Sequence, residues 1–136
     1  MSTEKLRILA IDDSPLLRRA FNDILGEDYI LDVEYNGEGG IKSAKENKPS
    51  LILLDIVMPG MNGFDVMAIL KADPETKNIP VIFITGDDSI SSKEKGYLLG
   101  AVDYIEKPLA EIVVKKRVEF NLMLAEYQKR FGTITL

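Results

Sequence analysis

A short apolar run that ends on a carboxylate constrains this chain more than any other feature. Residues 51–54 are apolar, Asp55 follows them, and a loop containing Pro59 and Gly60 comes next. An unbroken apolar run of this length is typical of a strand buried on both faces of a parallel sheet. We therefore expect Asp55 at the carboxyl end of such a strand, where open α/β sheets carry their functional groups. A carboxylate at this place is compatible with a nucleophile, a metal ligand, both, or a simple loop acid.

Apolar strand patterns alternate with helical patterns along the whole chain. The strands are expected at residues 6–11, 30–34, 51–55, 79–85 and 102–105. The helices are expected at residues 15–25, 37–47, 64–72, 91–99 and 109–130, the first of them opened by Ser14-Pro15. Strict alternation predicts an α/β fold, a single doubly wound sheet of five parallel strands with five helices on its two faces.

Length and composition exclude several classes of protein. A chain of 136 residues predicts one domain, which we place at residues 1–130 with a tail at 131–136. The absence of cysteine and histidine excludes disulfides, thiol chemistry, histidine triads and histidine metal sites. A net charge of −5 argues against direct nucleic acid binding by this domain. Without a signal peptide pattern or a membrane-length apolar run, we expect a cytoplasmic domain that does not bind membranes.

Five polar residues follow the ends of the predicted strands. Asp12 and Asp13 follow the first strand, Asp55 and Thr85 end the third and fourth, and Lys107 follows the fifth. Taken singly, each has an ordinary interpretation: acids in a turn before a helix, a β-branched strand residue, a solvated lysine. The carboxyl ends of parallel strands meet at one edge of a sheet, so we expect all five side chains to lie close together.

Three carboxylates at one edge repel each other unless a cation neutralises them. Oxygen ligands without histidine or cysteine favour Mg²⁺. A divalent cation, a lysine ammonium and a threonine hydroxyl around Asp55 would suit an incoming phosphoryl group, whose transfer depends on positioning and charge neutralisation. A carboxylate is also a known acceptor of phosphoryl groups.

On these residues the chain resembles the receiver domains of two-component response regulators, including those of chemotaxis. The resemblance runs from about residue 6 to about residue 129. It rests on four segments in this order and spacing: Asp12-Asp13, DIVMPGMNG at 55–63, IPVIFITG at 79–86 and GAVDYIEKPL at 100–109. It implies the flavodoxin-like receiver fold with strand order 2-1-3-4-5.

The resemblance also implies a role for each matching position. Asp55 matches the phosphorylated aspartate, which is also a metal ligand. Asp13 matches a direct Mg²⁺ ligand, Asp12 an acid that holds the ion through water, and Val57 a ligand through its backbone carbonyl. The phosphoryl donor would be a sensor histidine kinase or a histidine phosphotransfer protein, and the chain would be a regulatory phosphoacceptor with only self-catalysed transfer and slow autodephosphorylation, not an enzyme.

Thr85 and Lys107 match the pair that contacts the phosphoryl oxygens, and the bond from Lys107 to Pro108 is commonly cis in the family. Tyr104 matches the aromatic switch residue. After phosphorylation Thr85 would move inward, Tyr104 would turn in, and the surface of the fourth helix, fifth strand and fifth helix would change.

Val57 and Asp87 bear on the rate of dephosphorylation, and Val57 and Asp12-Asp13 bear on other functions. Val57 stands where many relatives have a polar side chain, so we predict slow self-dephosphorylation, which Asp87 near the site could also modulate. An aspartate phosphatase of the haloacid dehalogenase type needs a second aspartate at position 57, and a flavin-binding protein would have a phosphate loop where Asp12-Asp13 stands. A phosphorylation-independent interaction module with the receiver fold is the main alternative.

The last predicted helix, about 109–130, has more apolar surface than one face can bury. Val114, Val118, Leu122 and Ala125 form one stripe. Further apolar residues lie elsewhere on the helix: Ile112, Phe120, Met123, Leu124 and Tyr127. This surplus predicts a partner surface, used by a homodimer or by a helix that leads to an output domain. The alternative is an amphipathic helix with some exposed apolar side chains.

Overall fold

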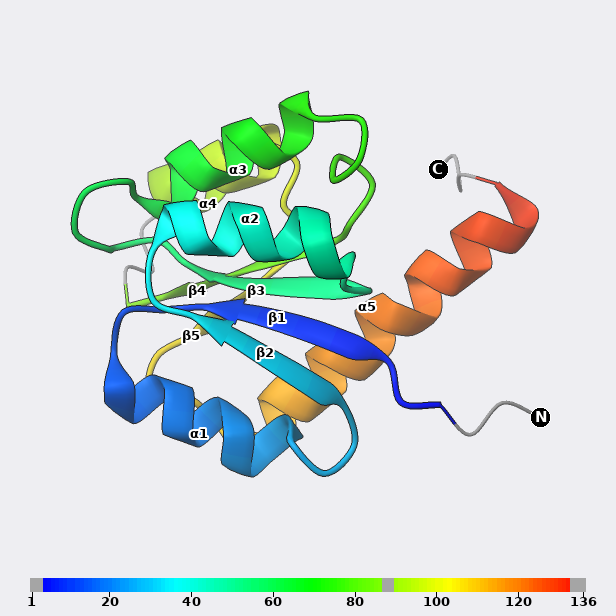
Figure 1. Cartoon of the computed structure of the whole chain (residues 1–136), viewed down its shortest axis with the longest axis horizontal. Helices are drawn as coiled ribbons and strands as arrows, with labels where there is room; N and C mark the ends of the chain where they lie inside the picture. Colours follow the sequence, from blue (N-terminus) through cyan, green and yellow to red (C-terminus); the bar gives the residue numbers. More distant parts are fainter. Residues whose placement is uncertain (1–3, 87–89, 133–136) are drawn as a thin grey trace.

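The chain folds into a five-stranded parallel sheet covered by helices on both faces, in a computed structural model that describes residues 4–86 and 90–132 (Figure 1). The strands are β1 (Arg7–Ile11), β2 (Ile30–Glu34), β3 (Leu51–Asp55), β4 (Val81–Thr85) and β5 (Asp103–Glu106). The helices are α1 (Pro15–Leu25), α2 (Gly37–Asn47), α3 (Gly63–Ala72), α4 (Ile90–Leu98) and α5 (Glu111–Phe131). The strand order β2-β1-β3-β4-β5 confirms the predicted doubly wound α/β fold.

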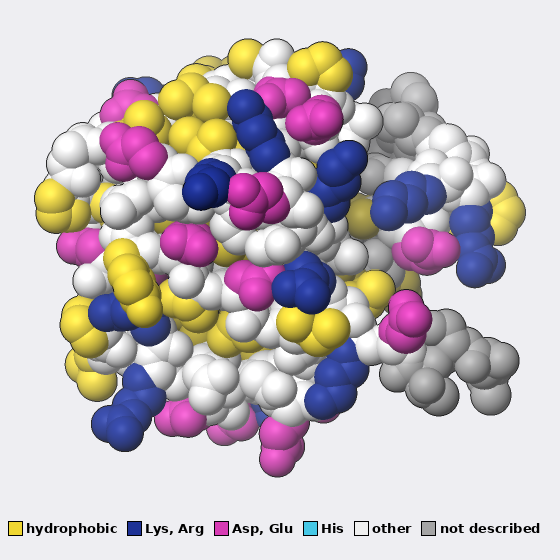
Figure 2. Space-filling view, viewed as in Figure 1, with side chains coloured by type: hydrophobic (Ala, Val, Ile, Leu, Met, Phe, Trp, Pro, Cys, Tyr) yellow, Lys and Arg dark blue, Asp and Glu magenta, His cyan; other side chains and the backbone are white. Residues whose placement is uncertain are grey.

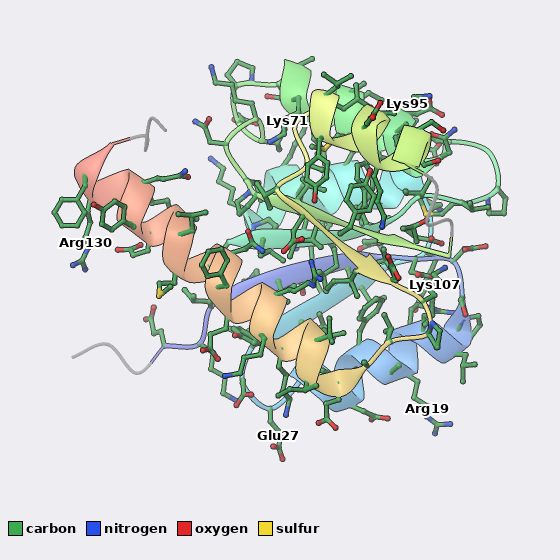
Figure 3. All side chains as sticks on the ribbon, turned by 180° about the vertical axis from the view of Figure 1, so that it is seen from behind. Arg19, Glu27, Lys71, Lys95, Lys107 and Arg130 are labelled. Atoms are coloured by element: carbon green, nitrogen blue, oxygen red, sulfur yellow. The ribbon has the colours of Figure 1, made fainter. Side chains whose placement is uncertain are left out.

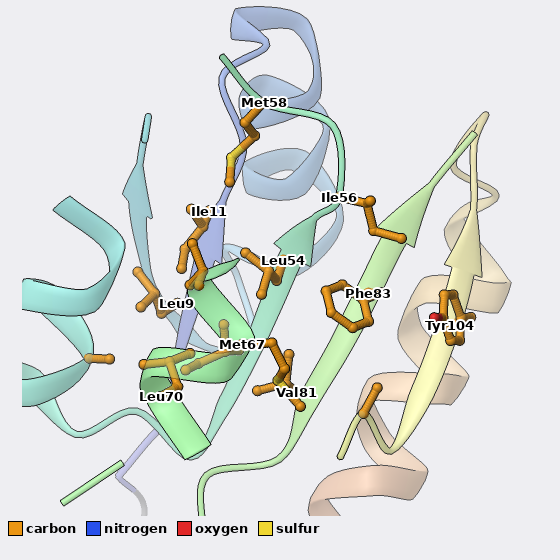
Figure 4. Close-up of a cluster of buried hydrophobic side chains, with 14 residues drawn as sticks. Leu9, Ile11, Leu54, Ile56, Met58, Met67, Leu70, Val81, Phe83 and Tyr104 are labelled. Carbon is orange, nitrogen blue, oxygen red and sulfur yellow. The ribbon is translucent and has the colours of Figure 1, made fainter. Parts of the chain in front are cut away.

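The sheet separates two hydrophobic cores. Helices α2, α3 and α4 cover one face, and α1 and α5 cover the other (Figure 1). Every residue of β3 is buried, and the strand alternates between the two cores: Ile52 and Leu54 belong to the first, Leu51 and Leu53 to the second. Figure 4 shows the first core, where Leu54 lies among side chains of α3 and the neighbouring strands. Burial on both faces explains why the sequence shows no polar alternation there.

Six elements, β1, β4, β5, α3, α4 and α5, differ from the predicted bounds by one or two residues, and β4 and α5 differ most. Strand β4 begins at Val81 instead of residue 79, because Pro80 has no N–H to donate to the hydrogen bonds between strands. The Pro80 carbonyl still accepts a hydrogen bond from the N–H of Ile52 at 2.9 Å. Helix α5 begins at Glu111 and includes Phe131, so it starts later and ends one residue later than predicted. Of the predicted tail at 131–136, residues 133–136 lie outside the described residues.

Helix α5 packs on the sheet along one stripe and then continues beyond it, as Figures 1 and 3 show. Val114, Val118 and Leu122 are buried in the second core, as the stripe predicts. Large apolar side chains remain exposed on the rest of the helix: Ile112, Val113, Phe120, Met123, Tyr127 and Phe131.

The surface seen in Figure 2 carries interspersed acidic and basic side chains, without a large region of one sign. Among the described helices, none is both long and apolar enough to cross a membrane.

Candidate functional site

The loop after β1 fixes the carboxylate of Asp12. The N–H of Asp12 donates to the carbonyl of Glu34 at 3.0 Å, which continues the pairing of β1 with β2. The N–H of Ser14 donates to Oδ1 of Asp12 at 2.8 Å, and the Ser14 hydroxyl caps α1 by accepting from the N–H of Leu17. Asp12 is therefore completely buried and held by backbone, with one of its two oxygens satisfied.

The loop after β3 is held close behind Asp55 by Gly63. The N–H of Gly63 donates to the carbonyl of Ile56 at 2.8 Å, and a Cβ at position 63 would meet the backbone carbonyl oxygen of Asp55 and the Cα of Ile56. Asn62 caps α3 in a reciprocal capping box with Asp65. Only glycine permits this approach of α3 to the end of β3, which places Gly63 among the residues that shape the site.

The three predicted acids converge at the carboxyl edge of the sheet. Each of Asp12, Asp13 and Asp55 offers a carboxylate oxygen, and these oxygens all lie within 4.8 Å of one another. Asp12 and Asp55 are buried, whereas Asp13 is exposed. Oδ2 of Asp12 is the one buried side-chain oxygen or nitrogen without a hydrogen-bond partner in the described part of the chain. A buried carboxylate oxygen without a donor, beside two further carboxylates, fits a hard divalent cation such as Mg²⁺.

The charges of these acids are costly in the folded protein. Burial raises the pKa of Asp12 from 3.8 to about 6. The hydrogen bond from Ser14 lowers this pKa, and the negative charge of Asp55 raises it further. Burial also raises the pKa of Asp55, against the opposing effect of Lys107. A bound cation would favour the ionised form of both groups.

Lys107 supplies the one positive charge that contacts Asp55 in the described structure. Its Nζ lies 3.1 Å from Oδ1 of Asp55, and the Asp55 side chain is only 3% exposed. The Lys107–Pro108 peptide bond is cis, as the resemblance implies. The N–H of Lys107 donates to the carbonyl of Thr85 at 2.8 Å, so the end of β4 positions the lysine backbone. Thr85 is buried at the end of β4, next to the strand that carries Asp55.

Tyr104 lies further along the sheet, on β5, with its ring turned inward and only 4% exposed. Its hydroxyl donates to the carbonyl of Ser92 in α4 at 2.9 Å. The ring packs against Phe83 with centroids 5.6 Å apart and against Tyr97 at 5.2 Å. Burial raises the pKa of Tyr104. The structure thus holds this residue in the orientation that the resemblance assigns to the switched state.

The remaining predicted positions are placed less centrally. The side chain of Val57 is 74% exposed, while its backbone hydrogen-bonds the Asp55 carboxylate. Asp87 lies outside the described residues. The sequence assigned no role to Gly63 or Gly96. Gly63 was expected in the loop before the third helix but begins α3, whereas Gly96 lies inside a helical pattern, where a glycine is a signal for a close approach.

Comparison with known proteins identifies the same family as the motifs. The sequence profile of the family described as response regulator receiver domain matches residues 8–119. The chain is 40% identical over 121 residues to the protein PilH of Pseudomonas aeruginosa, which covers 88% of this chain and 98% of PilH. It is 35% identical over 129 residues to the response regulator PleD of Caulobacter vibrioides, covering 91% of this chain but only 28% of PleD.

A solved structure supports the fold. The receiver domain of the sensor histidine kinase PA1611 of Pseudomonas aeruginosa, determined with a magnesium ion in its active site cleft, superposes with a TM-score of 0.81 at 20% identity. The superposition covers 88% of this chain and 99% of that domain. Together with the profile match over most of the chain, these likenesses show that the chain belongs to the response regulator receiver domain family.

Proposed function

We propose that this chain is a phosphoacceptor switch that takes a phosphoryl group on Asp55 from a histidine kinase or a histidine phosphotransfer protein. One observation carries the proposal, the arrangement of side chains at the carboxyl edge of the sheet. There the buried Asp55 pairs with Lys107 at 3.1 Å, and Asp12, in the same acidic cluster, has an oxygen without a hydrogen-bond partner. Family membership supports a role in phosphoacceptor signalling.

The transfer itself needs little from the chain beyond position and charge. A carboxylate oxygen of Asp55 attacks the phosphorus of the phosphohistidine, an oxygen–phosphorus bond forms, and the nitrogen–phosphorus bond breaks. The electron pair of that bond stays on the imidazole nitrogen, which takes up a proton. Lys107, already next to Asp55, would neutralise the phosphoryl oxygens, and the Thr85 hydroxyl would donate a hydrogen bond to them.

Asp12, Asp13, Asp55 and the backbone carbonyl of Val57 would hold Mg²⁺. When bound, the ion supplies positive charge that offsets the three carboxylates and the phosphoryl oxygens. The buried oxygen of Asp12 without a partner supports this assignment, as does the magnesium ion reported for the PA1611 receiver domain.

Phosphorylation would change the surface formed by α4, β5 and α5. An aspartyl phosphate carries more negative charge than Asp55 and offers more acceptor oxygens, so it would draw Thr85 toward the site. Tyr104, on the neighbouring strand, would respond by favouring its inward orientation. An output partner or domain that contacts this surface would then read the state of Asp55. The role is regulatory, and we predict a cytoplasmic location.

Incubation with Mg²⁺ and acetyl phosphate, followed by measurement of intact mass, tests this function. We expect a gain of one phosphoryl group in the wild type and none in Asp55→Ala. Asp23→Ala, which removes an acid exposed on α1, is the matched control and should be phosphorylated like the wild type. A wild-type protein that gains nothing would favour the phosphorylation-independent interaction module.

The exposed apolar side of α5 supports a second element of the proposal, contact with a second copy or with an output domain. Tyr127 and Phe131 form an exposed aromatic pair with ring centroids 4.8 Å apart near the end of the helix. Size measurement with and without beryllofluoride tests for a homodimer. Phe120→Glu should reduce association, whereas Glu119→Gln, at the neighbouring exposed position, should leave it unchanged.

A further inference from the structure

The inward position of Tyr104 depends on a surface of α4 that has no side chain. A Cβ built on Gly96 would overlap the Tyr104 hydroxyl oxygen and would lie 2.8 Å from Cζ of the same ring. It would also approach Cδ2 of Phe83 to 3.1 Å. Real Cβ atoms do not come so close to other atoms, so any side chain at position 96 is incompatible with the ring as it lies.

The Tyr104 hydroxyl is also bonded to the helix turn that precedes Gly96. It donates to the carbonyl of Ser92 at 2.9 Å and approaches the carbonyl of Lys93 at 3.3 Å. Carbonyl oxygens have two lone pairs, so they can accept this bond in addition to a helical one. The same ring therefore joins β5 to α4, but only while Gly96 leaves room for it.

We propose that Gly96 is the residue that permits the inward orientation of Tyr104 and so sets the balance between its inward and outward orientations. Gly96 is a positioning residue, because it acts on Tyr104 and does not contact the acidic cluster. The inference deepens the proposed switch, and its relevance to signalling rests on that function.

The surface beside Tyr104 has room for its ring in an outward orientation. A hollow of about 390 Å³ opens beside Tyr104 on the surface of α4, β5 and α5, lined also by Lys93, Tyr97, Glu106 and Arg117 among others. Lys93 pairs with Glu106 at 2.9 Å along this hollow, on partly exposed side chains that can rearrange. Because the atom that a Cβ at position 96 would meet first is the far end of a side chain, rotation of Tyr104 into the hollow relieves the overlap without moving the backbone.

NMR of the Gly96→Ala variant with carbon-13-labelled tyrosine tests this proposal, because it reports the orientation of the Tyr104 ring. The chain has five tyrosines, and the Tyr104 signal is assigned by its loss in Tyr104→Phe. In the wild type we expect protection from a soluble paramagnetic agent and a cross-peak to the Phe83 ring. In Gly96→Ala we expect loss of both. Alanine forms helix better than glycine, so α4 itself is not weakened by the change.

Gly39→Ala is the matched control, because the nearest atoms to a Cβ there, also inside a helix, would be side-chain ends, the Glu34 carboxylate at 2.8 Å and Oδ1 of Asn36 at 3.2 Å, and not Tyr104. The Tyr104 signal should be unchanged in this variant. A folded Gly96→Ala protein whose Tyr104 ring stays protected would overturn the proposal.

If Gly96→Ala alone does not fold, the double variant Gly96→Ala/Tyr104→Ala decides. A folded double variant supports the overlap with Tyr104 as the cause, and an unfolded one overturns it. The measurement uses neither metal nor phosphoryl donor, so it is independent of whether Asp55 accepts a phosphoryl group.

Discussion

Nζ of Lys107 lies 3.1 Å from Oδ1 of Asp55, although the two residues are 52 positions apart in the chain. The contact joins the end of β3 to the loop after β5 across the carboxyl edge of the sheet. Among the described residues, Lys107 is the one cation that contacts this almost completely buried carboxylate, so the pair is the centre of the electrostatics at the site.

Replacement of Lys107 by methionine should destabilise the protein at pH 7. The variant leaves the buried Asp55 carboxylate without its charged partner, and we expect the free energy of unfolding to fall by about 1–3 kcal/mol. Urea denaturation measures it. Lys116→Met is the control, because Lys116 is exposed and lies 4.0 Å from an exposed Glu119, so its loss should change stability little. Equal effects of the two variants would contradict this assignment.

The acidic cluster should make metal-free protein less stable as the pH rises from about 4 to about 6. The pKa of Asp12 is about 6 in the folded protein and 3.8 as a model value, so within this window the folded state binds more protons than the unfolded state. The free energy of unfolding therefore decreases with pH, for Asp12 by at most about 3 kcal/mol.

Urea denaturation at several pH values in EDTA measures this dependence. Asp12→Asn, which cannot ionise, should have a flatter profile than the wild type. The control Asp23→Asn should follow the wild-type profile. A wild-type profile that rises through this window would show that the buried acids do not bear the cost we assign to them.

Mg²⁺ should stabilise the folded protein and remove much of this cost. A ligand that binds only the folded state at one hundred times its Kd stabilises by about 2.7 kcal/mol. We expect thermal denaturation to shift upward with Mg²⁺, and to shift more at pH 8 than at pH 5, because protons compete for Asp12 and Asp55. Asp13→Asn should lose most of the shift, whereas an equal shift in this variant would argue against the site.

Replacement of Val57 by asparagine should shorten the lifetime of the phosphorylated state. The valine side chain is exposed beside Asp55 and cannot orient a water molecule, whereas an amide at this position can. The rate of phosphate release after removal of the donor measures the lifetime of the phosphorylated state. Val57→Ala removes apolar bulk without adding a polar group and serves as the control. An unchanged lifetime in Val57→Asn would refute the predicted slow self-dephosphorylation.

The sequence predicts those parts of the molecule that depend on periodicity and on strand ends. The run at 51–54 predicted β3 with its observed bounds, because burial on both faces leaves no polar alternation. The same run predicted Asp55 at the end of β3. Its convergence with Asp12 and Asp13 was predicted because parallel strands have their carboxyl ends at one edge of the sheet.

Contacts that depend on how helices and loops pack against the sheet were beyond prediction from the sequence. A helical pattern assigns Gly96 to α4 but gives no distance to Tyr104, because that distance depends on how α4 packs on β5. The unpaired oxygen of Asp12 likewise depends on which donors the folded loop brings to it. The inward orientation of Tyr104 follows from packing between Phe83 and Tyr97, which no local propensity determines.

The proposed function requires that Asp55 accept a phosphoryl group from nitrogen. The most direct measurement is incubation with Mg²⁺ and phosphoramidate, whose phosphorus–nitrogen bond resembles that of phosphohistidine, then borohydride reduction and peptide mass spectrometry. We expect the wild type to carry homoserine, the reduction product of an aspartyl phosphate, at position 55, and Asp55→Asn to carry none at any position. A wild-type protein without modification at Asp55, or with modification at another aspartate instead, would rule out Asp55 as the phosphoryl acceptor.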